Sequence, residues 1–366
     1  MFIEKEVFMS KIPHILVLNF GSTSSKVATY RGNIAEKSES ISHTTEELKQ
    51  FSTIWNQFEF RQEKVLKKIK EWGIDILDID VISCRGGCIK PCPAGIYSIT
   101  DKMIDDIKSE NYGIHPTGLG NIIAINLGRK YNIPAITVDT PASDEFCAEA
   151  RFSGLPQISR RSSFHVLNQK ATARKVATQI NKKYEEANMI VAHLGGGISV
   201  GVHKQGKIID ANNALDGDGP FSPERAGTLP AGDFARLCFS GEYTLAEIRK
   251  LVTNGGGLMG YLNTTDAREV EVRISNGDSN AELVYNAMIY KIAKEIGACA
   301  AVLDGEVDAI ALTGSLAFSD YLVSRLVKKI SFISKVYLNP GENELQALAE
   351  GAVRYFNGEE NLLEYN

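Results

Sequence analysis

Short apolar runs alternate along this chain with longer segments in which apolar residues recur every three or four positions. The short runs are bounded by Gly, Pro or Asp, which is typical of partly buried strands. They predict strands over residues 15–18, 27–30, 81–84, 135–138, 189–193, 198–203, 208–210 and 309–313. Because these strands alternate with helices, the pattern indicates an α/β fold.

Capping residues mark the starts of several predicted helices: Thr44, Thr244, Ser319 and Asn343. A glutamate stands at the third position after each threonine, which completes the spacing of a capping box. The longest helical pattern runs over residues 281–303. Its apolar residues at helical spacing predict one buried face, made of Leu283, Val284, Ala287, Met288, Ile292 and Ile296.

One arrangement occurs twice: strand, glycine-containing loop, strand, glycine turn, strand. The first copy reads HILVLN, FGSTSS, KVATY, RGN and IAEKSES; the second reads MIVAHL, GGG, ISVGVH, KQG and KIIDAN. Such a repeat is typical of a duplicated two-domain protein, although two β-meanders with glycine turns can also coincide. A length of 366 residues likewise favours two domains. We expect a first domain over 1–150 with 341–366 as its C-terminal helix, and a second over 151–340 that carries the nucleotide site.

Charge and composition exclude some classes of partner. The formal net charge is −5, which gives no general electrostatic footprint for nucleic acid or an anionic membrane. No apolar run approaches the ~20 residues of a membrane-spanning helix. The start, MFIEKEVFMSK, has no apolar core like that of a signal peptide. We therefore expect a cytoplasmic protein whose first eight residues are a lead-in or precede a natural start at Met9.

Three of the six cysteines recur every four residues, at Cys84, Cys88 and Cys92. Glycine and proline lie between them, so no helix would hold the three sulfurs on one face. The spacing matches neither a paired zinc motif nor a familiar iron–sulfur motif. We expect reduced thiols beside a functional loop, in keeping with the absence of a secretory signal.

The segment NFGSTSSK, residues 19–26, has the composition of a phosphate-binding loop. A Walker loop needs a glycine before its lysine and a helix after it, whereas here Ser25 precedes Lys26 and a strand follows. Gly21 still permits a sharp turn, the hydroxyl groups can donate to phosphate, and Lys26 adds a charge. A polar hairpin turn explains this segment alone equally well.

Two further glycine loops follow predicted strands. In HLGGGIS, His193 precedes Gly195, Gly196 and Gly197, whose exposed N–H groups can form a nest for an anion. In LTGSLAFSD, a glycine joins a strand to a helix start, an arrangement that suits a nucleotide but is also an ordinary helix cap. A loop of three glycines between two strong strands favours a ligand over a merely flexible turn.

In this order, the three loops resemble those of the acetate and sugar kinase/Hsp70/actin superfamily, in which two duplicated ribonuclease H-like domains with mixed sheets close on ATP in a central cleft. Longer stretches are similar to the butyrate kinase branch of the acyl kinase (acetokinase) family: ILVLNFGSTSSKVA, SCRGG, HLGGGISVGVH, DANNALDGDGPFSPERAGTLP and PGENELQALAEGA. The resemblance extends from about residue 15 to residue 355. The stretch DGDGPFSPERAG is its most specific part, because it separates the butyrate-type branch from acetate kinases.

The resemblance implies site residues where this sequence matches the family's motifs. The catalytic candidates are Arg85, Arg225, His165 and Asp139, and those for the substrate are His115 and Phe164. The candidates for ATP/ADP are Asn19, Ser22, Ser24, Lys26, His193, Gly195, Gly196, Gly197, Gly314 and Ser315. Those for Mg²⁺ are Asn19 and Asp139. His43 and His203 are expected to be solvated or core residues, and Asp216 and Asp218 to belong to a turn.

This sequence also departs from the acetate kinase pattern. Gly196 stands where acetate kinases have an asparagine, and Ser315 where the family usually has a second glycine. The glutamate that acetate kinases carry just beyond is absent, and Arg85 directly precedes a Gly-Gly pair without the residues that acetate kinases place between. The first three departures weigh against an acetate kinase, and a hydroxymethyl group at Ser315 could crowd the nucleotide base.

We therefore expect ATP-dependent, reversible phosphorylation of a short-chain carboxylate, butyrate or a branched acid such as isobutyrate, by direct in-line transfer. A carboxylic acid is already ionised at neutral pH, so it needs cations rather than a general base. One alternative is an acetate or propionate kinase, and a more distant one is an actin/Hsp70-like ATPase switch without an acyl acceptor. The resemblance also implies a homodimer or a larger assembly of dimers.

Overall fold

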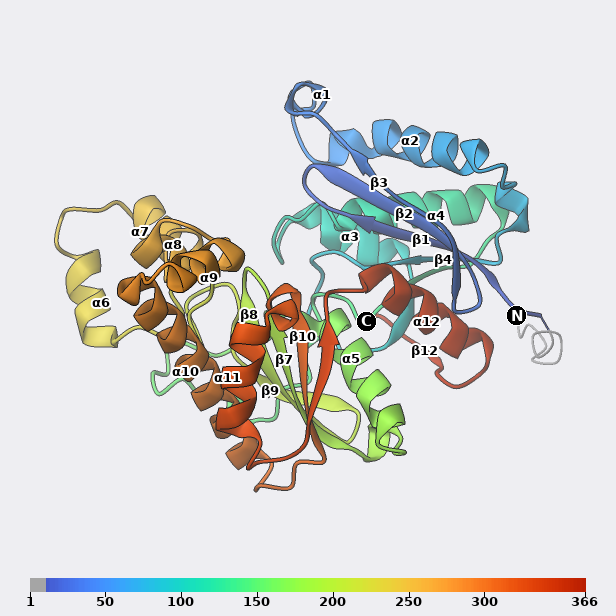
Figure 1. The fold of residues 1–366 in the computed structure, drawn as a ribbon. Helices are drawn as coiled ribbons and strands as arrows, with labels where there is room; N and C mark the ends of the chain where they lie inside the picture. The colour runs from blue at the N-terminus through green and yellow to red at the C-terminus, as the bar shows by residue number, and fades with distance from the viewer. Residues whose placement is uncertain (1–10) are drawn as a thin grey trace. The chain divides into compact units, whose positions relative to one another are not determined.

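The computed structural model describes residues 11–366, in two compact units. Unit 1 comprises the chain up to Ser143 together with Asn343–Asn366, and unit 2 comprises Asp144–Glu342 (Figure 1). The lead-in expected over the first eight residues lies outside the described residues. Residues 144–150, which the sequence placed in the first domain, belong to unit 2 because Phe146 and Ala150 pack against Ala211 in a small apolar cluster.

Unit 1 is built on a seven-stranded sheet in the order β12-β5-β6-β4-β1-β2-β3. Its strands are β1 (His14–Phe20), β2 (Ser24–Arg31), β3 (Ile34–Ser42), β4 (Val81–Cys84), β5 (Ile96–Ser98), β6 (Ala135–Val138) and β12 (Leu362–Leu363). Its helices are α1 (Thr45–Lys49), α2 (Phe58–Glu71), α3 (Asp101–Ser109), α4 (Gly118–Tyr131) and α12 (Glu344–Phe356). The apolar core lies between the sheet and helices α2, α3 and α4, while α12 covers the opposite face.

Unit 2 is built on a five-stranded sheet in the order β11-β10-β7-β8-β9. Its strands are β7 (Asn188–Leu194), β8 (Ile198–Lys204), β9 (Lys207–Ala211), β10 (Ala309–Gly314) and β11 (Val336–Pro340). Its helices are α5 (Val166–Gln179), α6 (Ala231–Cys238), α7 (Leu245–Thr253), α8 (Gly257–Leu262), α9 (Ala267–Ser275), α10 (Ser279–Val302) and α11 (Asp320–Ile330). Alternate strand residues face α5 on one side and α10 with α11 on the other.

Five strands of the first sheet have the same topology as the whole second sheet. In unit 1, β1, β2 and β3 form an antiparallel meander, and β4 and β6 continue the sheet parallel to β1. In unit 2, β7, β8 and β9 form the same meander, and β10 and β11 continue parallel to β7. The repeat seen in the sequence therefore corresponds to two copies of one fold, which confirms the α/β class and the duplicated ribonuclease H-like architecture.

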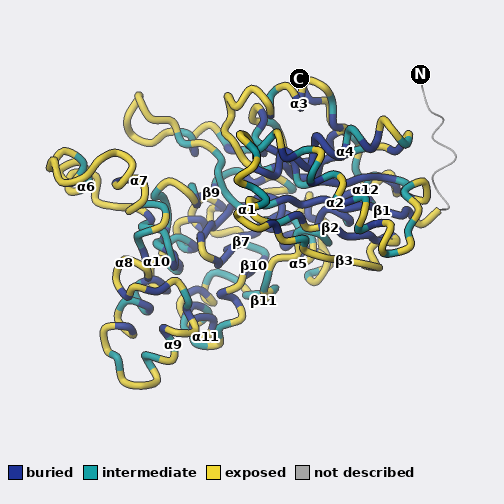
Figure 2. Tube along the Cα trace, turned by 90° about the horizontal axis from the view of Figure 1, so that it is seen from above, coloured by how far each residue is buried: buried dark blue, intermediate teal, exposed yellow. Residues whose placement is uncertain are grey.

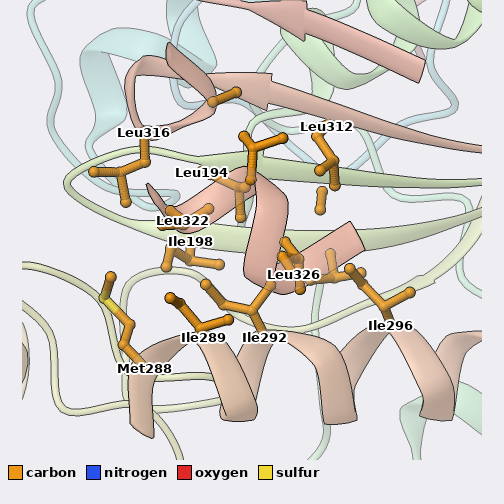
Figure 3. Packing of buried hydrophobic residues seen from close by; sticks show 14 of the residues in the cluster. Leu194, Ile198, Met288, Ile289, Ile292, Ile296, Leu312, Leu316, Leu322 and Leu326 are labelled. Atoms are coloured by element: carbon orange, nitrogen blue, oxygen red, sulfur yellow. The ribbon is translucent and has the colours of Figure 1, made fainter. Parts of the chain in front are cut away.

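The core of unit 2 forms where α10 and α11 pack on the sheet (Figure 3). Met288, Ile289, Ile292 and Ile296 of α10 are fully buried there, as the helical spacing predicted for three of them. The prediction for Leu283 was wrong, since 70% of this residue is exposed. Leu283 precedes Ile292 by nine positions, and at about 100° per residue it points to the opposite side of the helix.

Most of the predicted caps are confirmed. Thr44 and Thr244 each form a capping box, and the Ser319 side chain accepts a hydrogen bond from the Leu322 N–H. Asn343 does precede α12, but its side chain makes no capping bond, so this part of the prediction was wrong. Its φ of −120° and ψ of 59° lie outside the extended conformation of the three capping residues.

All six cysteines are free thiols, as expected. Burial raises the pKa of the Cys84 thiol to about 12, which keeps it protonated and unreactive. Within residues 11–366, no helix combines the length and the apolar character needed to cross a bilayer. The cytoplasmic location expected from the sequence stays a prediction.

Candidate active site

The predicted residues of unit 1 gather where three parallel strands end. Leu18 of β1 is paired with Cys84 of β4, and Cys84 with Thr137 of β6. Asn19, Arg85 and Asp139 follow these positions directly or within two residues, so they lie at one edge of the sheet. The carboxyl ends of parallel strands are where open α/β sheets bind their ligands.

Glu344, the first residue of α12, joins two of these groups. Its carboxylate accepts a hydrogen bond of 2.6 Å from the Asn19 amide and forms an ion pair of 2.8 Å with Arg85. The sequence interpretation missed Glu344, although it lies in the quoted stretch PGENELQALAEGA. A glutamate in the first turn of a helix that follows a strand and a glycine is the signal that could have revealed it.

The first loop, residues 19–26, presents its polar groups on the face that α12 covers. Lys26 is directly opposite Asn19 in the antiparallel pair β1–β2, so the two side chains lie next to each other on one face. Ser24 lies two residues before Lys26 on the same strand and shares that face. Ser22 and Lys26 are exposed. The loop thus offers hydroxyl groups and a cation where phosphate binding was predicted.

A buried arginine that the sequence interpretation did not identify supports this loop from the opposite side. Arg61 of α2 is 0% exposed, and its guanidinium donates to the carbonyl oxygens of Gly21 at 2.9 Å, Ser22 at 2.8 Å and Ser24 at 3.1 Å. Burial lowers the pKa of Arg61 to about 10, so it remains charged at neutral pH. The loop carbonyls therefore turn inward, towards a fixed positive charge.

His43 is a core residue beside this arginine, one of the two outcomes expected for it. It is 4% exposed, and its Nε2 lies 2.8 Å from the Ser25 hydroxyl. Burial, and then the positive charge of Arg61, lowers the pKa of His43 to about 4. His43 is consequently neutral at pH 7 and adds no second charge under the loop.

His115 and Asp139 are the remaining candidates in unit 1. The Nδ1 atom of His115 accepts from the Thr117 N–H at 3.3 Å, and desolvation, followed by the charge of Arg85, holds the pKa of His115 below its usual value. Asp139 is 1% exposed and has a φ of 42°, which is uncommon for a residue other than glycine. Left-handed backbone in a non-glycine residue recurs at functional sites, which suits Asp139 as a site residue.

In unit 2, the glycine loop, residues 195–197, lies directly under Arg225. A Cβ atom at Gly197 would collide with the Arg225 guanidinium, which also donates to the Ala214 carbonyl oxygen. Burial lowers the pKa of Arg225, while Glu224 and Asp216 counteract this effect. The Ser222 hydroxyl donates to the Gly196 carbonyl oxygen at 2.5 Å and accepts from the Arg225 N–H at 3.1 Å. The structure thus brings these two predicted groups together.

The Glu224 side chain lies against the glycine at position 196. A Cβ atom at Gly196 would lie 2.5 Å from the Glu224 carboxylate oxygen. An asparagine, which acetate kinases carry at this position, would therefore need Glu224 to move away. The exchange of asparagine for glycine and the stretch GPFSPERAG are thus parts of one local arrangement.

His165 and His193 stack on each other, with ring centroids 3.7 Å apart and planes 11° from parallel. His193 is the penultimate residue of strand β7, beside the glycine loop, and its Nε2 lies 3.2 Å from a Glu342 oxygen. The Nδ1 atom of His165 lies 3.1 Å from the Ser199 hydroxyl of β8. The two predicted histidines therefore form one cluster, next to Gly195.

Phe164, Gly314 and Ser315 complete the predicted set. Phe164 is half-buried and stacks on Phe146, with centroids 6.2 Å apart. Gly314 has a φ of 88°, and a Cβ atom there would collide with the Leu194 carbonyl oxygen, so the turn after β10 requires glycine. Ser315 is exposed at the start of a short 3₁₀ turn.

The described residues hold no ready cluster of three or more His, Cys, Asp or Glu side chains for a metal ion. The donors near the edge of unit 1 nevertheless suit a hard cation, because their atoms are oxygens. The Asn19 amide nitrogen is hydrogen-bonded to Glu344, which leaves the Asn19 side-chain oxygen as its potential ligand.

A duplicated ribonuclease H-like architecture with glycine loops at the strand ends is the fold of the acetate and sugar kinase/Hsp70/actin superfamily. The sequence profile of the acetokinase family matches residues 155–353. The chain belongs to this family, whose members transfer phosphate to carboxylates.

Similar proteins agree with this assignment. A probable butyrate kinase of Clostridium botulinum (strain Eklund 17B / Type B) is 48% identical over 346 residues, which cover 94% of this chain and 98% of the relative. Butyrate kinase 2 of Clostridium acetobutylicum is 46% identical over 351 residues, 96% of this chain and 99% of the relative. The crystal structure of Porphyromonas gingivalis acetate kinase has a TM-score of 0.73 at 18% identity, covers 92% of this chain and 98% of its own, and shows the shared fold.

Proposed function

We propose that this protein is a butyrate-type acyl kinase, which transfers the γ-phosphoryl group of ATP to butyrate or a branched acid of similar size and releases ADP. The observation that carries the proposal is the packing of Glu224 and Arg225 on the glycine loop. The stretch that contains them distinguishes the butyrate branch, and it packs on the loop in which Gly196 stands where acetate kinases have an asparagine. Relatives named butyrate kinase over nearly the full chain support the same choice.

The chemistry follows from the charges on the two units. A carboxylate acceptor is ionised at neutral pH and needs no general base. It needs cations that offset the repulsion between two anions, and we assign Arg85, Arg225 and Lys26 to this role. Donors placed where charge develops on the transferred phosphoryl group are worth most in such a reaction. We assign that stabilisation to Arg225 and His165, and the substrate side to His115 and Phe164.

The nucleotide and its metal use the remaining groups. We assign the phosphates of ATP to the first loop with Asn19, Ser22, Ser24 and Lys26, and to the glycine loop; Gly314 and Ser315 are assigned to the rest of the nucleotide. Asn19 and Asp139 would hold Mg²⁺, and Glu344 is a third oxygen donor beside Asn19. When bound, the metal would neutralise charge on the β- and γ-phosphates.

A hydroxamate assay across acetate, propionate, butyrate, isobutyrate and isovalerate tests the substrate. We expect kcat/KM for butyrate or isobutyrate to exceed that for acetate at least about 10-fold, since each methylene in an apolar pocket is worth ~10–200-fold. A preference for acetate or propionate would favour the first alternative. Release of phosphate from ATP at the same rate with and without any acid would favour the ATPase switch and overturn the kinase assignment.

We also propose that the chain forms a homodimer through the segment over residues 228–247. No residue of this segment is buried, and α6, which lies within it, has eight residues and no buried side chain (Figure 2). So short a helix is not stable in water by itself. The exposed apolar side chains of the segment include Leu229, Leu237, Phe239, Tyr243 and Leu245.

The occupant that we propose for this surface is a second copy of the chain. The segment over residues 228–247 carries three acidic side chains, Asp233, Glu242 and Glu247, and one basic side chain, Arg236, so its formal net charge is −2. A surface with both signs and a small net charge can pair with a second copy of itself around a two-fold axis, whereas a strongly charged partner would favour a larger excess of one sign.

A further inference from the structure

Two consecutive residues of α5 are linked to the stacked histidine pair by hydrogen bonds, one directly and one through a serine. Asn168 and Gln169 are 7% and 0% exposed, and neither was singled out by the sequence. Asn168 reaches His193 directly, and Gln169 reaches His165 through Ser199. Buried amides have fixed donor and acceptor ends, so their orientation determines which ring nitrogen of each histidine carries the proton.

The orientation of the Gln169 amide follows from a main-chain carbonyl. Its Nε2 atom lies 3.2 Å from the Ser199 carbonyl oxygen and 2.9 Å from the Ser199 hydroxyl. A carbonyl oxygen only accepts hydrogen bonds, so the amide atom that faces it is the nitrogen. The Gln169 oxygen therefore faces the Nε2 atom of His203, at 3.1 Å, and His203 donates to it.

His203 accepts a hydrogen bond on one ring nitrogen and donates one from the other. It is 0% exposed, and the Tyr184 hydroxyl lies 2.9 Å from its Nδ1 atom, the nitrogen that accepts. Burial, and then the charges of Lys170 and Arg174, lowers the pKa of His203 to about 3, so the ring is neutral and has one donor and one acceptor. His203 is thus a core residue, one of the two outcomes expected for it.

At the other end of this series of hydrogen bonds, the last acceptor is His165. The Ser199 hydroxyl accepts from Gln169, and its own hydrogen points to the Nδ1 atom of His165, at 3.1 Å. Within the part of the chain that the structure describes, the Ser199 hydroxyl has no other acceptor. We call the series Tyr184, His203, Gln169, Ser199 and His165 the donor chain, because each member donates to the next.

The Asn168 amide is oriented in a similar way. The Thr313 hydroxyl donates to the Gly341 carbonyl oxygen at 3.0 Å, so it must accept from the Asn168 nitrogen at 3.3 Å. The same nitrogen lies 2.8 Å from the Nδ1 atom of His193. His193 consequently accepts at Nδ1 and carries its proton on Nε2, which faces Glu342 at 3.2 Å.

We propose that Asn168 and Gln169 are positioning residues that hold both stacked histidines in the neutral form protonated on Nε2. This inference rests on the proposed function for its catalytic meaning. A His165 ring with its proton on Nε2 can donate to an anionic phosphoryl oxygen from that atom, whereas the other tautomer would present a lone pair there and repel it. In His193 the Nε2 proton faces Glu342, so Asn168 fixes the partner against which His165 stacks. The donor chain and the Asn168 contact therefore fix the tautomers of His165 and His193 before substrate binds.

Nitrogen-15 NMR of the full-length protein, labelled at histidine and free of substrate, tests the tautomers directly. We expect acceptor-type Nδ1 signals for His165, His193 and His203, assigned by losing one signal at a time in H165N, H193N and H203N. Since no substrate is present, this result does not depend on which acid the enzyme uses. A protonated Nδ1 in neutral His165 would overturn the donor chain.

Two variants extend the test to activity. Gln169→Leu and Ser199→Ala should give a mixed tautomer signal for His165 and lower kcat by about 10- to 100-fold, as when the hydrogen-bond partners of metal-binding histidines are removed. KM for ATP should change little. Gln179→Leu is the matched control, because Gln179 is exposed at the end of the same helix and should leave both signal and kcat unchanged.

Each of the two variants tests the donor chain without the other. Ser199→Ala removes only one hydroxyl, so it remains informative if Gln169→Leu does not fold. A His165 signal that stays of the Nε2–H type in a folded variant, together with unchanged kcat, would show that the donor chain does not position this ring. A failed acid panel with the expected NMR result would instead leave the tautomers established and the proposed substrate wrong.

Discussion

Single residues at this site depend on close packing as much as on charge. Arg225 lies over a glycine that leaves no room for a methyl group, and Arg61 holds three carbonyl oxygens of the first loop. The sequence identified Arg225 because it lies in a specific motif. It did not identify Arg61, Gln169 or Glu344, since an isolated arginine, glutamine or glutamate in a helix is most often an ordinary surface residue. Only the fold shows which atoms they contact.

Arg225→Ala should lower kcat by about 10²–10³-fold, because a preorganised donor to the transferred phosphoryl group is lost. Steady-state kinetics with butyrate measures the effect, and circular dichroism checks the fold. Arg268→Ala is the control, as the side chain of this arginine is 90% exposed and, among residues 11–366, pairs with Asp266 alone. Near-normal turnover of Arg225→Ala would remove Arg225 from the reaction.

His43 should make stability depend on pH in a defined direction. Its pKa is about 4 in the folded protein and about 6.5 in the unfolded chain, so between these values the unfolded chain binds more protons. The folded state is therefore stabilised above pH 6.5 and loses this stability as the pH falls towards 4, by about 1–3 kcal/mol.

Urea unfolding at pH 7.0 and pH 5.0 measures this loss. His43→Gln should reduce the difference between the two pH values, while His203 continues to contribute with the same sign. An unchanged difference in the variant would mean that His43 does not titrate in this way.

At the scale of elements, strands and helix starts were predictable because they depend on local patterns. Every predicted strand lies inside an observed one, and three of four capping residues make the expected bond. The errors at Leu283 and Asn343 concern which side of a helix meets the core and how the chain enters α12. At about 100° per residue Leu283 does not share a face with Ile292, so a stricter use of the helical period would have excluded it. The entry of the chain into α12 depends on contacts far away in the sequence, which a capping pattern alone cannot identify.

The glycine loop gives a prediction at this scale. Gly197→Ala places a methyl group against the Arg225 guanidinium and should displace it, so kcat should fall in the direction of the Arg225→Ala value. Gly297→Ala in α10 is the matched control, since a Cβ atom there meets nothing within 4 Å and alanine favours a helix. Equal kcat values for both variants would show that the loop tolerates a side chain.

At the scale of the whole molecule, the duplication was the most informative feature of the sequence. The two meanders begin two sheets in which five strands have the same order, β6-β4-β1-β2-β3 and β11-β10-β7-β8-β9. The sequence does not reveal which charged side chains meet at the edge of each sheet, because these side chains come from separate strands and from α12. The site residues and the cleft between the domains stay predictions.

The homodimer is testable at this scale. Wild-type protein should sediment as a dimer at micromolar concentration, and Phe239→Glu should raise the dissociation constant at least about 100-fold, because each copy loses one buried aromatic side chain. Phe332→Glu is the control. Phe332 is 84% exposed, similar to Phe239 at 91%, but it lies outside the segment. A monomeric wild-type protein would contradict the proposal, as would equal weakening by both variants.

The return of the chain to unit 1 at Asn343 has a consequence for biosynthesis. Unit 2 is one continuous segment, so it can fold as soon as residue 342 has left the ribosome. Unit 1 lacks α12, edge strand β12 and the carboxylate of Glu344 until the last part is translated. A message truncated near its end would therefore yield a nascent chain whose first-made half exposes an apolar sheet face, a substrate for chaperones and proteases rather than a partly active enzyme.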